Sequence, residues 1–298
     1  MSARPGTITR RTVSATRRVE GVGLFTGATS AVEICPASAG DGIAFEREGV
    51  RIPATIDHLS VAPVHPAFEK MPPRCTSLER GGVVVHTVEH IMAALAGLGI
   101  TDATVRTEGP EIPIGDGSAI GFVRPILEVG LHELESEDAT RVLDPIRIKA
   151  PIRVERDGSS IIIEPSAQPE YVYALDYGPG APIPSGEASW EGGGDAGLAF
   201  AERVAPARTF SLQGEAEAMR AMGMFTHLTP RDMLVFGEDG PIENELRFPD
   251  EPARHKLLDL IGDLALVGGP ICARIIADRS GHALAHEAAR RLVAVSRA

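Results

Sequence analysis

The chain has little of the chemistry that defines several large protein classes. Its 298 residues include only three cysteines, which lie far apart at Cys35, Cys75 and Cys272. Because no Cys-x-x-Cys pair occurs, a disulfide framework and a cysteine zinc site are both disfavoured, which fits a reducing cytoplasm. No apolar run reaches the ~20 residues that span a bilayer. The sequence therefore predicts a cytoplasmic protein with no stable membrane insertion.

Basic charge is also scarce. Lysine and arginine total 29 against 41 acidic residues, which gives a formal net charge of −12. This balance argues against nucleic acid as a partner and gives no general attraction for anionic ligands. Any phosphate would have to be held by particular basic residues. The glycine-rich stretches match neither a phosphate-cradling P-loop nor a dinucleotide fingerprint.

The pattern of predicted elements indicates an α+β fold. The chain is 43% hydrophobic, enough for one large core or two modest ones, and its 32 glycines and 23 prolines predict many turns. Each half offers several strands and about two helices, with the strands grouped rather than strictly alternating with helices. This grouping favours two α+β domains over a doubly wound sheet. The acidic stretch 133–138 is the candidate linker, so we predict domains at 1–137 and 138–298.

The stretch 250–270 reads as one helix with clear ends. Asp250 can cap its first turn, Pro252 suits that turn, and Gly268 follows its last residues. Along this helix His255, Asp259 and Asp263 recur every four residues. An imidazole and a carboxylate one turn apart can bind a single zinc ion, and Asp263 is placed to support such a site. The alternative is a helix whose ionisable residues face solvent.

A second stretch supplies the complementary groups. Thr87 is a good N-cap, which puts Glu89 and His90 in the first turn of a helix predicted over residues 87–98. The positive end of the helix dipole there favours an ionised Glu89 and a neutral His90. With His255 and Asp259, His90 would give three zinc ligands and leave one position for water, whose proton Glu89 can take. A structural Glu-His pair is the alternative.

His86 opens a competing interpretation. His86-x-x-Glu89-His90 fits the pattern of inverzincin metallopeptidases, in which both histidines bind zinc from one helix. A strand at 83–85 and a Thr87 cap would instead leave His86 outside the helix. The interpretation also leaves His255 and Asp259 without a purpose.

Three further residues have types suited to catalysis or binding. His282 begins the last predicted helix and could act as general acid, with Asp263 fixing its orientation. Thr209 offers a hydroxyl that could donate to an oxyanion, and Lys256 could meet a phosphate. Each has a plain alternative as a solvated or capping residue. No partner spacing is readable for the remaining histidines, namely His58, His65, His132, His227 and His286.

Taken together, these stretches resemble the family of UDP-3-O-acyl-N-acetylglucosamine deacetylases (LpxC), the zinc amidases of lipid A biosynthesis. The segments that carry the resemblance follow the family's order and spacing across nearly the whole chain: Gly21-Val22-Gly23-Leu24, Thr87-Val88-Glu89-His90, Leu95 to Ile100, Glu111-Ile112-Pro113-Ile114, Asp116-Gly117-Ser118, Ala207 to Phe210, Arg254 to Leu264, and Gly281-His282-Ala283-Leu284.

The resemblance implies two similar α+β domains packed face to face, with the active site between them. It implies zinc on His90, His255 and Asp259, with Fe²⁺ as the alternative ion, and Glu89 as general base. His282 would protonate the leaving group with support from Asp263, and Thr209 would bond the oxyanion. Lys256, Phe210 and Leu24 would contact the substrate. Each domain would carry an insert, near 59–76 and 211–228, the second lining an apolar passage for an acyl chain.

Three departures from the family pattern concern the substrate pocket. Phe25 stands where histidine is usual, Ala285 stands where asparagine is usual, and residues 224–227 replace a glycine-rich turn. None removes an expected ligand or acid–base residue. The departures therefore bear on acyl-chain preference and substrate contacts rather than on amide hydrolysis.

The sequence thus predicts a monomeric zinc amidase whose partners are UDP-3-O-acyl-N-acetylglucosamine and water, and which releases acetate and the free 2-amine. Two alternatives stay open at this point. The substrate could be another N-acylated sugar nucleotide, or the chain could be a catalytically silent zinc-containing binding or regulatory protein.

Overall fold

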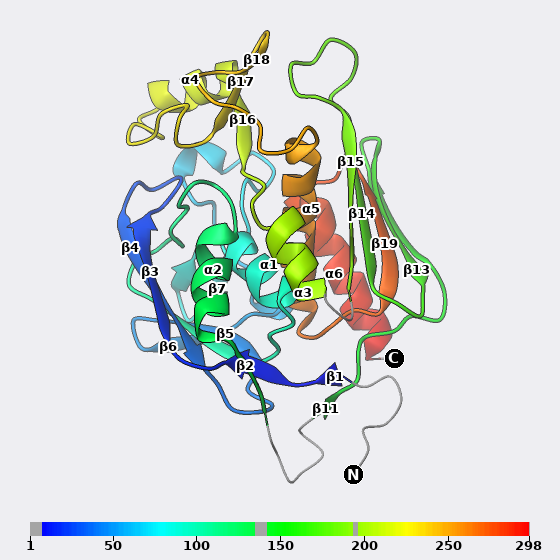
Figure 1. Cartoon of the computed structure of the whole chain (residues 1–298). Coiled ribbons are helices and arrows are strands. Elements are labelled where there is room, and N and C mark those ends of the chain that lie inside the picture. Colours follow the sequence, from blue (N-terminus) through cyan, green and yellow to red (C-terminus); the bar gives the residue numbers. More distant parts are fainter. Residues whose placement is uncertain (1–7, 135–141, 193–195, 298) are drawn as a thin grey trace.

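Two five-stranded mixed sheets organise the molecule, as Figure 1 shows. The structure is a computed structural model, and it describes residues 8–134, 142–192 and 196–297. The first sheet has the order β3 (Arg17–Val22), β4 (Thr29–Pro36), β9 (Ala103–Thr107), β5 (Ile43–Arg47) and β6 (Val50–Pro53). The second has the order β12 (Ile152–Arg156), β13 (Ser159–Pro165), β19 (Ala273–Asp278), β14 (Glu170–Leu175) and β15 (Gly186–Glu191). The predicted α+β class is confirmed.

Both sheets have the same topology. In each, the strand that comes last in the chain lies at the centre, with an antiparallel neighbour on one side and a parallel neighbour on the other. In β14 buried and less buried residues alternate, and the buried positions are Tyr171, Tyr173 and Leu175. Such alternation is expected where one face of a sheet covers a core. The repeated topology is consistent with two similar domains.

Helices fill the space between the sheets (Figure 1). They are α1 (Glu89–Gly97), α2 (Ile120–Val129), α3 (Ala196–Arg203), α5 (Glu251–Leu264) and α6 (His282–Ser296). Helix α2 contacts β3 of the first sheet, while α5 contacts β14 and β15 and α6 contacts β12 of the second. Helices α1 and α5 each precede the central strand of their sheet, and they pack against each other in the middle of the molecule.

A glycine permits this central contact. A Cβ atom added at Gly262 would lie 2.0 Å from the backbone oxygen of Glu89. Gly262 is buried in the interior of α5, where glycine is otherwise an unfavourable helix residue. The close approach brings the first turn of α1, with its Glu89 and His90, against the face of α5.

Shorter strands complete the fold. Strand β1 (Ile8–Thr9) pairs with β11 (Val142–Leu143), β2 (Arg11–Val13) with β10 (Leu131–Glu133), and β7 (Leu78–Arg80) with β8 (Val83–Val85). A three-stranded sheet of β16 (Phe210–Leu212), β17 (Leu234–Gly237) and β18 (Gly240–Pro241) lies with helix α4 (Gln213–Ala221) at one end of the molecule (Figure 1). Short 3-10 helices occur at η1 (Ile56–His58), η2 (Pro66–Phe68) and η4 (Ala265–Val267).

Some local predictions need correction. Within the glycine-rich stretch 178–197, residues Gly186–Glu191 form strand β15, and helix α3 begins at Ala196. Asp250 does not cap α5 with its side chain, because its carboxylate accepts a hydrogen bond from Nε of Arg254 at 2.7 Å instead. Pro252 lies in the first turn as expected. The predicted domain boundary at residue 137 lies outside the described residues, and the division into domains stays a prediction.

Two further findings concern the elements that the sequence lacks. None of the helices in the described ranges combines the length and the apolar character that a membrane crossing requires. The three cysteines are all buried as free thiols.

Gly262→Ala should destabilise the protein, because the added methyl would overlap the Glu89 carbonyl and force α1 and α5 apart. Overpacking of this kind costs about 1–3 kcal/mol, which thermal or urea unfolding would detect. Gly121→Ala, at an exposed position of α2, is the matched control, since nothing lies within 4 Å of its added Cβ. Equal stability of the two variants would show that the close contact is not needed.

Candidate metal centre and catalytic site

Three potential ligands converge where α1 meets α5. The residues are His90, His255 and Asp259, all buried, and their ligand atoms lie within 4.8 Å of one another. Oδ1 of Asp259 lies 3.5 Å from Nε2 of His90 and 3.4 Å from Nε2 of His255. The spacing of four along α5 puts His255 and Asp259 on one face, as expected.

His255 is in the form that a metal needs. Its Nδ1 lies 3.1 Å from the carbonyl oxygen of Ala207. A carbonyl only accepts hydrogen bonds, so Nδ1 carries the proton and Nε2 presents its lone pair to the other ligands. Burial lowers the pKa of His255 to about 3, against the opposing effect of Asp259, so the ring is neutral near pH 7.

The Asp259 carboxylate has one paired and one unpaired oxygen. Nζ of Lys256 donates to Oδ2 at 2.9 Å, while Oδ1 is buried with no hydrogen-bond partner in the described part of the chain. Burial alone would raise the pKa of Asp259, but His255 and Lys256 hold it well below its usual range. A buried, ionised and unpaired oxygen between two imidazole nitrogens suits a divalent cation, and this donor set is typical of zinc.

Glu89 lies beside these ligands with its carboxylate fully enclosed. The backbone N–H of Thr76 donates to its Oε2 at 2.9 Å. Burial raises the pKa of Glu89 to about 7, against a lowering effect of His282 and His90. The sequence argument from the helix dipole, which favoured ionisation, is therefore outweighed by burial. A cation on the neighbouring ligands would lower this pKa again, because a nearby positive charge favours the carboxylate.

An aspartate–histidine pair completes the polar group. His282 begins α6 as predicted, and its Nδ1 lies 2.8 Å from Oδ2 of Asp263. Burial alone would lower the pKa of His282, but Asp263 raises it to about 9. The pKa of Asp263 is lowered to about 2 by His282 and His286, despite burial. At neutral pH the pair thus consists of a His282 imidazolium and an Asp263 carboxylate. The imidazolium can donate a proton from its Nε2.

Thr209 directly precedes β16, the strand before α4, and Phe210 is the first residue of that strand. The backbone N–H of Thr209 donates to the carbonyl of Gly117 at 2.7 Å, and a Cβ on Gly117 would lie 2.9 Å from Thr209 Cγ2. The Gly-Asp-Gly turn therefore positions Thr209. The ring of Phe210 lies 6.2 Å from that of His255 and 5.6 Å from Nζ of Lys256.

Leu24 belongs to a separate apolar cluster and is not among the candidate metal ligands and their neighbours. It is buried there with Phe25, whose ring packs against Phe68 at 5.6 Å and Phe225 at 5.7 Å. The cluster joins the loop after β3 to the segment that follows α4. Phe25, one of the departures from the family pattern, thus has a packing role.

The residues before α1 differ from the sequence prediction. Thr87 does not cap the helix; it has a φ of 60°, and its hydroxyl donates to Oε1 of Glu111 at 2.9 Å. The buried Glu111 carboxylate also accepts from the backbone N–H groups of Phe25 and Thr26. Glu111 thereby links its own segment to the loop after β3 and to the residues before α1. The Thr87 hydroxyl bonds to this carboxylate instead of to the backbone at the start of α1.

His86 lies outside α1, at the end of β8, and its Nδ1 is 2.8 Å from the Ser77 hydroxyl. It is not among the residues that converge as potential metal ligands in the described structure. The inverzincin arrangement, which needs both histidines on one helix, is therefore not formed.

Sequence reasoning missed two residues that touch the acid–base groups. Thr76 and His286 are both buried next to Asp263. The Thr76 hydroxyl contacts Oδ1 of Asp263 and Nε2 of His286. His286 follows His282 by one helical turn, so its spacing was a usable signal. Nothing in the local sequence marks Thr76, which reaches the site only through tertiary folding.

The converging ligands, the adjacent glutamate and the imidazolium together have the composition of a metal-dependent hydrolase. Comparisons with known proteins agree with this class. The chain belongs to the family described as "LpxC: UDP-3-O-acyl N-acetylglycosamine deacetylase", whose model matches residues 10–294.

Relatives named UDP-3-O-acyl-N-acetylglucosamine deacetylase are similar over nearly the whole chain. The protein from a Nostoc species is 36% identical over 93% of this chain and 95% of its own length. That of Anaeromyxobacter dehalogenans is 38% identical over 96% of this chain and 87% of its own. That of Chlamydia pneumoniae is 35% identical, with 92% and 93% covered.

His255→Ala should reduce the zinc content of the purified protein far below that of the unaltered protein. Loss of an outer partner of a ligand already costs roughly 10–100-fold in affinity, and loss of a ligand should cost more. Elemental analysis after dialysis measures this. His132→Ala, at an exposed position of β10, should keep its metal. Full zinc retention by His255→Ala would remove His255 from the ligand set.

Proposed function

We propose that this protein removes acetate from the 2-acetamido group of UDP-3-O-acyl-N-acetylglucosamine, a step of lipid A biosynthesis, and that zinc is its cofactor. Family membership supports the substrate and the reaction. The observation that supports the chemistry is the buried, unpaired Oδ1 of Asp259, enclosed by His90 and His255 beside Glu89.

His90, His255 and Asp259 would hold the zinc ion. When bound there, zinc would supply a Lewis acid that polarises the amide carbonyl and makes water more acidic. The remaining work belongs to side chains of this chain.

Glu89 acts as the general base in this proposal. Its Oε2 is engaged by the Thr76 N–H, which leaves Oε1 to take the proton from the attacking water. The oxygen of that water forms the new bond to the carbonyl carbon. Because Glu89 is buried, bulk water is kept from competing for the proton.

His282 acts as the general acid. As the carbon–nitrogen bond breaks, the electron pair goes to nitrogen, and Nε2 of His282 supplies its proton. Asp263 holds Nδ1, so the acidic Nε2 points away from that carboxylate. Thr209 would donate its hydroxyl to the oxyanion. The products are the free amine and acetic acid, which ionises to acetate, and the proton on Glu89 then restores the imidazolium.

Lys256 is proposed to meet the nucleotide-sugar phosphates. Its ammonium group already donates to Asp259, but such a group has three N–H donors. The Lys256 side chain is also 24% exposed to solvent. The same lysine can therefore hold a metal ligand and an anionic oxygen.

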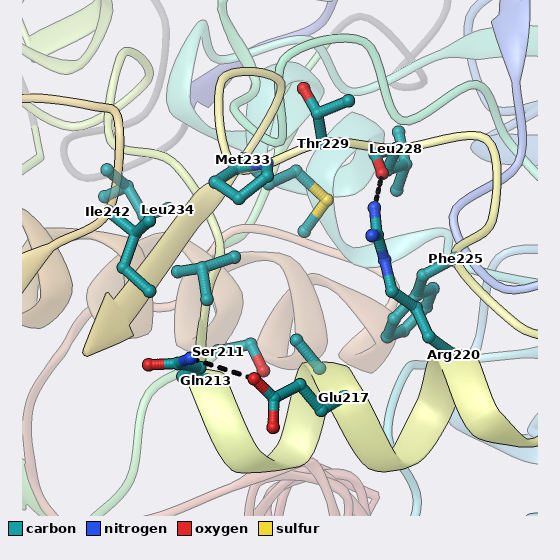
Figure 2. Close-up of a pocket in the computed structure, with 13 residues that line it drawn as sticks. Ser211, Gln213, Glu217, Arg220, Phe225, Leu228, Thr229, Met233, Leu234 and Ile242 are labelled. Atoms are coloured by element: carbon teal, nitrogen blue, oxygen red, sulfur yellow. Dashed lines mark hydrogen bonds between the residues drawn. The ribbon is translucent and has the colours of Figure 1, made fainter.

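A cavity of about 200 Å³ between α4 and β17 would take the acyl chain. Figure 2 shows apolar groups of Phe225, Leu228, Met233, Leu234 and Ile242 around it. Polar groups lie at its border, where Gln213 bonds to Glu217 and Arg220 bonds to the carbonyl of Leu228. Ser211 lines the cavity and follows Phe210, whose ring lies 6.2 Å from that of His255, so the cavity is suited to receive a chain from a sugar held at the metal centre.

Glu89→Ala should lower the rate of deacetylation by roughly 10²–10⁴ while zinc stays bound, because the base is lost and the ligands are kept. Free-amine release from UDP-3-O-acyl-N-acetylglucosamine by zinc-loaded protein measures this rate. Glu128→Ala, at an exposed position of α2, is the control and should be unaffected. Unchanged turnover in Glu89→Ala would remove this residue from the mechanism.

Ala216→Phe should fill the cavity and raise KM for the acylated substrate about tenfold, since displacing two methylenes costs ~1.6 kcal/mol. Ala218→Phe on the exposed side of α4 should leave KM unchanged. The measurement compares UDP-linked N-acetylglucosamine with and without its 3-O-acyl chain. Equal loss on both would indicate general damage to the insert, and turnover that ignores the acyl chain would favour another N-acylated sugar nucleotide.

A further inference from the structure

Behind the catalytic groups, a chain of buried hydrogen bonds links residues that are far apart in sequence. We propose that Thr76 and His286 are positioning residues that fix the Asp263–His282 pair and join it to Glu89. The inference rests on the proposed deacetylation and deepens it, because it assigns a part in the reaction to two residues outside the catalytic set.

Thr76 contacts both the proposed general base, Glu89, and the aspartate that holds the general acid, Asp263. Its backbone N–H donates to Oε2 of Glu89 at 2.9 Å, and its hydroxyl donates to Oδ1 of Asp263 at 2.5 Å. The residue is completely buried, so no water competes for either bond. One residue therefore sets the position of the general base and of the carboxylate that orients the general acid.

The direction of each hydrogen bond follows from proton counting. Thr76 has one hydroxyl proton, and an ionised Asp263 can only accept, so that proton goes to the carboxylate. Nε2 of His286 lies 2.7 Å from the same hydroxyl and must therefore be the donor. His286 lies 3.7 Å from Oδ1 of Asp263, too far for a direct hydrogen bond. Any hydrogen-bonded link from His286 to Asp263 therefore passes through Thr76.

This network holds the Asp263 carboxylate at both oxygens. Oδ1 accepts from Thr76 and Oδ2 accepts from Nδ1 of His282, so rotation of the carboxylate would break two bonds at once. His286 follows His282 by one turn of α6, and the two rings are stacked with centroids 6.2 Å apart. The bond from Nδ1 to Asp263 and the stacked ring of His286 together restrain the orientation of the His282 ring, while Nε2 stays available to the substrate.

A structural role and a positioning role predict different results. If the network only satisfied buried polar groups, its removal would lower the melting temperature and leave kcat unchanged. If it positions the acid, its removal lowers kcat while KM and zinc content stay the same, because neither residue touches substrate or metal ligands.

The main test compares Thr76→Val, which removes the hydroxyl and keeps shape and backbone N–H, with Thr76→Ser, which keeps the hydroxyl. We expect Thr76→Val to lower kcat about tenfold, and Thr76→Ser to stay within about twofold of the unaltered enzyme; tenfold corresponds to ~1.4 kcal/mol. Equal kcat in Thr76→Val and the unaltered enzyme, or equal loss in both variants, would overturn the proposal.

His286 has its own matched pair. His286→Leu removes the donor to Thr76, while His286→Gln keeps an N–H at a similar reach. His286→Leu should lower kcat several-fold and His286→Gln should recover most of it. The double variant Thr76→Val/His286→Leu should be no slower than Thr76→Val alone, since both act through one bond to Asp263. Additive losses would contradict a single chain of contacts.

A second readout does not depend on turnover. Nitrogen–proton correlation NMR of the imidazole rings in zinc-loaded protein should show His286 with its proton on Nε2. Thr76→Val should shift the ring signals of both His282 and His286. Unchanged signals would overturn the network. Absence of deacetylation by the unaltered protein would count against the proposed function, and these spectra would still decide whether Thr76 joins the two histidines.

Discussion

Helices α1 and α5 approach each other so closely at Gly262 that the Glu89 carbonyl occupies the space where a side chain would begin. Helix axes normally keep a distance set by the side chains between them. Here that layer is missing at one point, and the polar residues on either side of it meet directly. The candidate metal ligands, the proposed base Glu89 and the aspartate Asp263 all lie on the two helices that meet at this contact.

The repeated topology explains why the contact lies at the centre. Each sheet receives a helix just before its middle strand, and the two equivalent helices face each other. The first contributes Glu89 and His90 from its initial turn, while the second contributes His255, Asp259 and Asp263 along its length. Neither sheet with its own helices carries a complete set of groups, so the site exists only in the joined molecule.

The sequence predicted what local spacing determines. The intervals from His255 to Asp263 follow from helical geometry, and the start of α6 at His282 follows from the glycine before it. Predictions failed where a distant partner outcompeted a local one. Thr87 bonds to Glu111 rather than capping α1, and burial outweighs the helix dipole at Glu89. Thr76 could not be found from sequence spacing, because its importance comes from neighbours 13 and 187 positions away.

The folded chain holds the Asp259 carboxylate in its interior, and its Oδ1 has no hydrogen-bond partner among the described residues. A buried acceptor without a partner costs roughly 1–3 kcal/mol, a sizeable share of the stability of a protein. Binding of metal to the folded form alone adds stability by mass action, about 2.7 kcal/mol at a hundredfold excess over the dissociation constant. If the proposed zinc ion binds here, the folded fraction of the protein would rise and fall with the metal supply of the cell. Metal starvation would then lower both the stability and the activity of the chain.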